Sequence, residues 1–204
     1  MEYRMEHDSM GEVRVPADKY WGAQTERSHE NFPIGVGLET MPREITRAFG
    51  VLKLAAARAN HVLKPEKMTK EKLTAIEKAA TEVLEGKLVE HFPLVVWQTG
   101  SGTQSNMNAN EVIANRGNEI AGKKLLHPND DINMSQSSND TFPTALHIAA
   151  VCALEDGVLP ALAELIDSLK RLEAENEGVI KAGRTHLQDA TPISFPQEIS
   201  GWRS

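Results

Sequence analysis

The sequence is poor in several features that would point to particular classes of protein. It has one cysteine, Cys152, in 204 residues, so no internal disulfide can form and no cysteine-based metal site is available. Aromatic residues make up 5%, and 22 Lys and Arg stand against 29 Asp and Glu, which gives a net charge of −7. Because binding to a phosphate backbone needs clustered cations, we expect no nucleic-acid partner.

Long apolar runs and sorting signals are also missing. No uninterrupted apolar run approaches the roughly 20 residues that a membrane-spanning helix needs. The first residues, Met-Glu-Tyr-Arg-Met-Glu-His-Asp, resemble neither a signal peptide nor a transit peptide. We therefore expect a cytoplasmic protein with no membrane partner; a mitochondrial location would require that a transit segment has been removed.

Helical periodicity dominates what is present. After an irregular or hairpin-like start over residues 1–40, apolar residues recur at three- and four-residue steps over 42–63. A second helix is predicted after Thr69, which is a plausible N-cap, and ends before Gly86. The sequence thus predicts a mainly α protein with a short irregular or hairpin start.

Two further helices are predicted downstream. Residues 103–121 support one despite their asparagines, and residues 142–175 support another, interrupted around Gly157 and Pro160. The second has apolar residues on more than one face, so we expect other helices to bury it on several sides. A last helix is predicted from Pro192 onward.

Three polar segments lie between or at the ends of these helices. They cover residues 100–111, 127–140 and 183–192, and all are dense in small hydroxyl and amide side chains. Such clusters on an apolar helical scaffold are typical of a site that binds a small, oxygen-rich anion by many hydrogen bonds. The first segment would lie at a helix N-terminus, whose unpaired N–H groups favour a carboxylate.

The hydroxyl groups in these segments have two interpretations. Ser101-Gly102-Thr103 could bind a carboxylate, or Ser and Thr could act as ordinary helix N-caps, and spacing alone favours neither. The same alternatives apply to Ser137-Ser138-Asn139, where the Asn139 amide can both donate and accept hydrogen bonds.

His127 and His186 are the candidate acid/base groups, because histidine titrates near neutral pH. A metal site formed by His127 with Asp130 and Asp131 is the weaker interpretation, since Pro128 stiffens a loop that lacks further ligands. Serine hydrolysis is disfavoured because no Gly-x-Ser-x-Gly sequence occurs.

The three segments resemble the three signature regions of the fumarase/aspartase superfamily, and the resemblance is greatest to class II fumarases. It extends from Asp8-Ser-Met-Gly-Glu12 to Gln197-Glu-Ile-Ser-Gly-Trp202. Gly100-Ser-Gly-Thr-Gln104, Ser137-Ser-Asn139 and Thr185-His186 favour fumarase over aspartase. A histidine can exchange a proton with a hydroxyl leaving group, whereas glutamine cannot.

The resemblance implies a role for each segment. It implies that His186 exchanges the catalytic proton, and that a second, non-catalytic dicarboxylate site is formed by His127, Pro128, Asn129 and Asp130. It further implies reversible dehydration of (S)-malate to fumarate without metal or organic cofactor. The residues implied to bind the dicarboxylate are Ser101, Gly102, Thr103, Ser137, Ser138, Asn139 and Thr185.

One departure from the family is large. The family's mobile Gly-Ser-Ser loop, followed by Met-Pro-x-Lys-x-Asn, supplies a serine base and a lysine, and these residues do not occur here. The resemblance therefore implies an N-terminal lyase domain over residues 1–137 and the beginning of a central helical bundle over 138–204. It also implies a homotetramer for the longer protein and an inactive, self-associating chain for these 204 residues alone.

Two alternatives to fumarate hydratase stay open at this point. An aspartase-like ammonia lyase would release ammonia from aspartate. A non-catalytic structural member of the superfamily, such as a lens crystallin, would turn over neither substrate.

Overall fold

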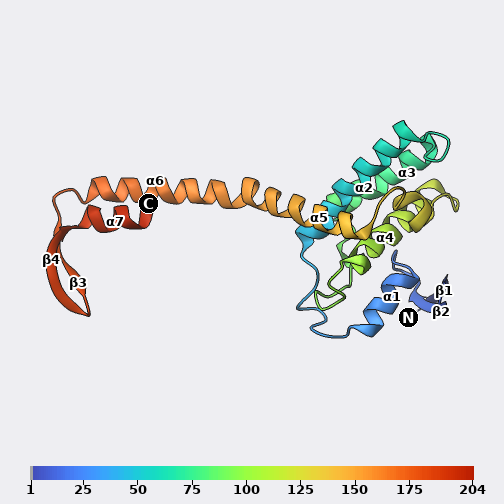
Figure 1. Ribbon diagram of the computed structural model, residues 1–204, viewed down its shortest axis with the longest axis horizontal. Coiled ribbons are helices and arrows are strands. Elements are labelled where there is room, and N and C mark those ends of the chain that lie inside the picture. The colour runs from blue at the N-terminus through green and yellow to red at the C-terminus, as the bar shows by residue number, and fades with distance from the viewer. Residues whose placement is uncertain (1) are drawn as a thin grey trace. The chain divides into compact units, whose positions relative to one another are not determined.

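The computed structural model describes residues 2–204, and the chain divides into two compact units, Met1–Ala150 and Val151–Ser204. Helices account for most of the described residues, and the strands of this part form two separate two-stranded sheets (Figure 1). The prediction of a mainly α fold is confirmed. The predicted domain boundary between residues 137 and 138 stays a prediction.

The first unit begins with a hairpin, as the sequence indicated. Strand β1 (Tyr3–Asp8) pairs antiparallel with β2 (Gly11–Pro16), and helix α1 (Ala23–Asn31) follows. Helix α1 was not predicted, because its sequence is polar and carries no apolar period. It forms because another helix supplies acceptors for its N-terminus.

That acceptor is the carboxylate of Glu111, which is buried on helix α4. The backbone N–H groups of Gly22, Gln24 and Thr25 donate to it at 2.8, 2.9 and 3.1 Å, and the Thr25 hydroxyl donates at 2.6 Å. Burial raises the pKa of Glu111, while these four hydrogen bonds oppose that shift. A buried carboxylate at a helix N-terminus thus fixes α1 against α4.

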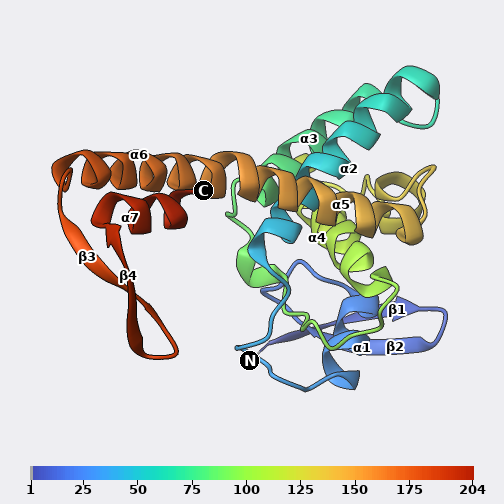
Figure 2. The same cartoon turned by 60° about the vertical axis from the view of Figure 1, so that its left-hand side comes forward.

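Helices α2 (Arg43–Leu63) and α3 (Lys70–Leu84) lie side by side in both ribbon views (Figures 1 and 2). A Cβ atom on Gly50 would lie 2.7 Å from the backbone nitrogen of Leu84, so glycine permits this close approach. The Thr69 hydroxyl accepts from Lys72 N, and Gly86 takes a φ of 77° just beyond α3. Both predicted ends of α3 are confirmed.

The buried face of α2 agrees with the apolar period over its first half, where Ile45, Ala48 and Phe49 are buried, and departs from it further on. The last apolar residues of the period, Val62 and Leu63, are 78% and 75% exposed. Lys53 and Asn60 are buried there, so two polar side chains occupy the inner face. The polar groups there need hydrogen-bond partners, and those partners come from the candidate site.

Helix α4 (Thr103–Ala121) agrees with the prediction, after a short 3₁₀ turn, η1 (Val89–His91). The predicted loop at His127–Asp130 is wrong in part, because Pro128–Ile132 form one π-helical turn, η2, which the Asp131 carboxylate closes onto His127 N at 2.8 Å. Helix α5 (Ser138–Ala153) begins earlier than predicted, since Ser138 to Asp140 form its first turn and Pro143 lies inside the helix.

The second unit contains the π turn η3 (Leu154–Val158), helix α6 (Leu159–Glu175), strands β3 (Ile180–Thr185) and β4 (Gln188–Ser194), and helix α7 (Phe195–Arg203). The predicted interruption around Gly157 is present as a change in hydrogen bonding, because the π turn η3 separates α5 from α6, although the helix does not end there. The predicted loop at 183–189 is also wrong, since it is an antiparallel hairpin.

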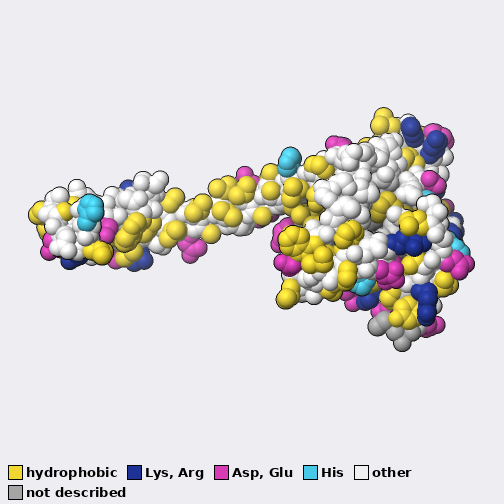
Figure 3. Space-filling view, turned by 60° about the horizontal axis from the view of Figure 1, so that its bottom comes forward, with side chains coloured by type: hydrophobic (Ala, Val, Ile, Leu, Met, Phe, Trp, Pro, Cys, Tyr) yellow, Lys and Arg dark blue, Asp and Glu magenta, His cyan; other side chains and the backbone are white. Residues whose placement is uncertain are grey.

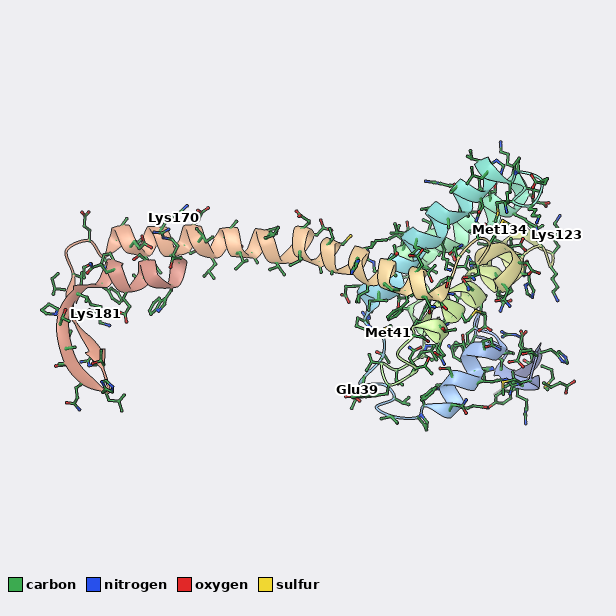
Figure 4. All side chains as sticks on the ribbon, in the orientation of Figure 1. Glu39, Met41, Lys123, Met134, Lys170 and Lys181 are labelled. Carbon is green, nitrogen blue, oxygen red and sulfur yellow. The ribbon has the colours of Figure 1, made fainter. Side chains whose placement is uncertain are left out.

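Side-chain contacts tie the parts of this unit together. Helix α7 starts with a capping box in which Ser194 accepts from Gln197 N, and it packs against α6. Lys181 on β3 pairs with Glu198 at 2.5 Å, and Arg203 pairs with Glu173 of α6 at 2.7 Å. Figure 4 labels Lys181 on the hairpin and Lys170 on α6.

The long helix keeps much apolar surface uncovered. Its exposed apolar side chains gather along the helix in Figure 3 and include Leu154, Val158, Leu159, Leu162 and Leu165. By length and composition Ser138–Glu175 could cross a membrane, with a mean hydropathy of 1.5 over its most apolar window, and a core helix of a soluble protein passes the same test. The expected burial of this helix on several sides is not met by residues 2–204.

Candidate functional site

The first two polar segments meet in the first unit. Thr103 is the first residue of α4 and Ser138 the first of α5, and their hydroxyl oxygens lie 3.0 Å apart. The row continues from Thr103 to Ser101 at 3.1 Å and on to Thr99 at 3.4 Å. Residues 35 positions apart in the sequence thus form one exposed row of hydroxyl groups at two helix starts.

Gly102 allows the two helix starts to come together. Its φ of 73° is in the left-handed region, and a Cβ atom there would overlap the ring of Phe142 on α5. Gly102 also occupies the N-cap position of α4, with no side-chain cap. The first N–H groups of α4 therefore lack helical acceptors and carry a partial positive charge beside Thr103.

The helix N-cap interpretation holds for Ser137 but not for Ser101 or Thr103. Ser101 precedes the N-cap and Thr103 follows it, so neither hydroxyl caps α4. Ser137 does cap α5, because its hydroxyl accepts from Asn139 N at 3.3 Å. Carboxylate binding by Ser101, Thr103 and Ser138 stays a prediction that this geometry favours, whereas Ser137 also has a structural role.

Thr185 and His186 belong to the second unit. Thr185 ends β3, and His186 and Leu187 form the two-residue turn to β4 with φ values of 51° and 63°. Positive φ at two successive non-glycine residues is strained, and such strain is concentrated at functional sites. All three side chains are exposed, and Leu187 reaches 95%.

The predicted second dicarboxylate segment lies at η2. His127 Nδ1 accepts from Asp130 N at 3.3 Å, and both side chains are exposed. Asn129 and Asp130 line an open groove of about 590 Å³, and three lysines and two further carboxylates line it as well, namely Lys64, Lys67, Lys72, Glu66 and Asp131. Lys72 is paired with Asp131, so the lining carries charges of both signs, and a dicarboxylate site here stays a prediction.

The metal interpretation of this segment lacks a third free ligand. Asp131 is buried, and its carboxylate accepts from Lys72 Nζ at 2.6 Å and from His127 N at 2.8 Å. Among residues 2–204 no three His, Cys, Asp or Glu side chains are grouped closely enough to hold a metal ion.

Lys53 on α2 was not among the predicted site residues, yet its side chain is only 1% exposed. Its ammonium donates to the amide oxygens of Asn106 at 2.7 Å, Gln136 at 2.9 Å and Asn133 at 3.3 Å. Within residues 2–204 it pairs with no carboxylate, and burial lowers its pKa to about 7. The signal was the spacing Phe49, Lys53, Ala57, which places the lysine on the inner face of α2.

We expect Lys53 to make stability depend on pH in a specific way. The folded-state pKa of about 7 lies below the unfolded value, so between pH 7 and 10 the unfolded chain binds a proton that the folded chain does not. The free energy of unfolding should therefore rise with pH relative to Lys53→Met, by up to about 1.4 kcal/mol per pH unit. Urea unfolding of both proteins at pH 7, 8 and 9 measures this, and parallel pH profiles would contradict it.

Comparison with known proteins shows which family this chain resembles in sequence. A family model described as lyase matches residues 11–204. Fumarate hydratase class II of Bacillus cereus is 62% identical over 206 residues, which cover 99% of this chain and 44% of the relative. The mitochondrial fumarate hydratase of Rhizopus oryzae is 56% identical over 206 residues, covering 98% of this chain and 41% of the relative.

A solved structure shares the fold. The crystal structure of recombinant class II fumarase from Schistosoma mansoni gives a TM-score of 0.93 at 43% identity, covering 99% of this chain and 43% of that one. The chain thus spans less than half the length of each of these relatives. Because the family model covers nearly all of its residues, the chain belongs to the lyase family, as the three polar segments predicted.

Proposed function

We propose that this chain carries the dicarboxylate-binding part of a fumarate hydratase, which adds water to fumarate to give (S)-malate and catalyses the reverse reaction. One observation carries the proposal: the hydroxyl groups of Thr103 and Ser138 meet at 3.0 Å where two helices begin. Hydroxyl donors beside uncapped helix N–H groups are suited to a carboxylate. The identity of the named relatives supports fumarate as the dicarboxylate.

The proposed reaction assigns chemistry to the named side chains. A base removes a proton from C3 of malate, and the electron pair moves into the adjoining carboxylate, which becomes more negative. Thr103, Ser138 and the N-terminus of α4 stabilise that charge by donating hydrogen bonds. The C2 hydroxyl then leaves as water, with a proton that the family resemblance assigns to His186, and the C2–C3 double bond of fumarate forms.

The second histidine has a different proposed role. His127 is the N-cap of η2, and Asn129 and Asp130 line an open groove whose lining carries three lysines and three carboxylates. We assign His127, Pro128, Asn129 and Asp130 to a second dicarboxylate site that binds without turnover. Ser101, Gly102, Ser137 and Asn139 of the first unit are assigned to the substrate site, and the family resemblance gives Thr185 of the second unit a substrate-binding role as well.

Replacing each histidine separates these roles. In the protein carried to the length of its relatives, we expect His186→Asn to lower kcat by about 10²–10⁴-fold, because it removes an acid/base group. His127→Asn is the matched control and should retain kcat within a few fold. Fumarate absorbance during malate dehydration measures both.

Equal losses in the two variants would reverse the assignment of the histidines. A wild-type protein of that length with no malate dehydration would defeat the proposed function itself. Ammonia release from aspartate by the same protein would indicate the aspartase-like alternative instead.

We further propose that the longer protein is a cytoplasmic homotetramer. The exposed leucines and valines of α6 and η3 support the oligomer, because burying apolar surface contributes about 25 cal/mol per Å². We expect sedimentation to show the 204-residue chain self-associating through this helix. A monodisperse monomer at high concentration would argue against it.

A further inference from the structure

The burial of Lys53 has no role in the reaction proposed above. Its ammonium is removed from water and, within residues 2–204, meets only neutral amide oxygens, from Asn106, Asn133 and Gln136. A buried charge without a counter-ion is costly, and an apolar side chain of similar length would fill the same space at lower cost. Side-chain volume therefore does not explain why this position holds a lysine, and another property of lysine must.

That property is the ability of its ammonium group to donate hydrogen bonds while accepting none. An ammonium group only donates hydrogen bonds, so each amide that faces Lys53 must present its oxygen. The Asn106 oxygen accepts from Lys53 and also from the Thr141 hydroxyl at 3.0 Å. Its amide nitrogen is thereby directed to the Asn133 oxygen at 3.1 Å. Lys53 thus sets the orientation of the whole amide cluster.

Asn106 on α4 and Thr141 on α5 each lie about one helical turn beyond the hydroxyl row formed by Thr103 and Ser138. Asn106 N donates to Gly102 O at 3.1 Å, which closes the first turn of α4. Thr141 N donates to Ser137 O at 2.9 Å, which closes the first turn of α5. Asn106 and Thr141, which are hydrogen-bonded to each other, therefore close the first turns of the two helices that carry Thr103 and Ser138.

Gln136 extends the same arrangement to the segment before α5. Its amide oxygen accepts from Lys53, and its amide nitrogen donates to the carbonyls of Ile132 and Met134 at 2.9 and 3.1 Å. Figure 4 labels Met134 in this segment. The chain that enters Ser137 and Ser138 is therefore fixed by the same ammonium group.

We propose that Lys53 is a positioning residue for the dicarboxylate site, whose buried ammonium orients Asn106 and Gln136 and so holds the starts of α4 and α5 with Thr103 and Ser138 in register. The nature of the ligand rests on the proposed function, whereas the positioning does not. Lys53 itself does not touch the substrate.

Hydrogen exchange of the 204-residue chain at about pH 6, where Lys53 keeps its proton, tests the positioning without any ligand. Lys53→Met should speed exchange at the Asn106 and Thr141 amides by about tenfold or more relative to amides inside α3, because it removes hydrogen bonds to a charged group. Ile76→Val and Ile76→Ala, at a fully buried residue of α3, are controls for general destabilisation. They should change exchange without singling out these two amides.

Dicarboxylate binding tests the consequence for the site. With fumarate as the probe in calorimetry, Lys53→Met should weaken the affinity about tenfold. Lys53→Gln keeps a donor and should recover part of it, and the Ile76 variants should bind as the unmodified chain does. If Lys53→Met does not fold, Lys53→Gln is compared with the unmodified chain in both measurements.

The outcomes separate the two proposals. If Lys53→Met speeds hydrogen exchange equally at all amides, or leaves the rates at Asn106 and Thr141 unchanged, the positioning role is overturned whatever the chain binds. Selective exchange with no fumarate binding by the unmodified chain would support the positioning role and count against the proposed function. Selective exchange with unchanged fumarate affinity in the variants would overturn the link between Lys53 and the site.

Discussion

A single amide oxygen, that of Asn106, joins the three helices on which the candidate site depends. Lys53 of α2 and Thr141 of α5 both donate to it, while Asn106 itself belongs to α4. The helix starts that carry Thr103 and Ser138 are each closed one turn away from this point. Gly102 completes the constraint, because no larger residue would fit between α4 and the ring of Phe142.

The first unit contains two buried charges of opposite sign, and each is hydrogen-bonded to neutral polar groups. The Lys53 ammonium is surrounded by amide oxygens, and the Glu111 carboxylate by backbone N–H groups and the Thr25 hydroxyl. In each case the charge joins segments that are distant in sequence, α2 to the helix starts and α1 to α4. A charged group that is fully hydrogen-bonded in this way fixes one arrangement of the chain, since any slip would leave the charge unsatisfied.

The sequence predicted well those features that are set by local chemistry. The ends of α3 followed from Thr69 and Gly86, and α4 was placed correctly after its two glycines. The meeting of the first two polar segments followed from their shared composition and from the family resemblance. The helix ends depend on a few residues that are near one another in the chain, whereas the two segments that meet lie 35 positions apart and were linked by composition and resemblance alone.

Features set by distant partners were not predictable in the same way. Helix α1 depends on Glu111, about 85 to 90 positions away along the chain, and its own sequence carries no apolar period. The inner face of α2 was misplaced over its second half because Lys53 and Asn60 are buried, whereas periodicity treats lysine and asparagine as surface residues. The hairpin around His186 was predicted as a loop because its turn residues, His and Leu, are unusual at positive φ.

A titration of the isotope-labelled chain with fumarate tests most directly whether the starts of α4 and α5 form one carboxylate site. If they do, the backbone amide resonances of Thr103, Gln104 and Ser138 shift together and saturate at one fumarate concentration. Shifts confined to Asn129 and Asp130, or resonances of the two helix starts that move independently of each other, would contradict it.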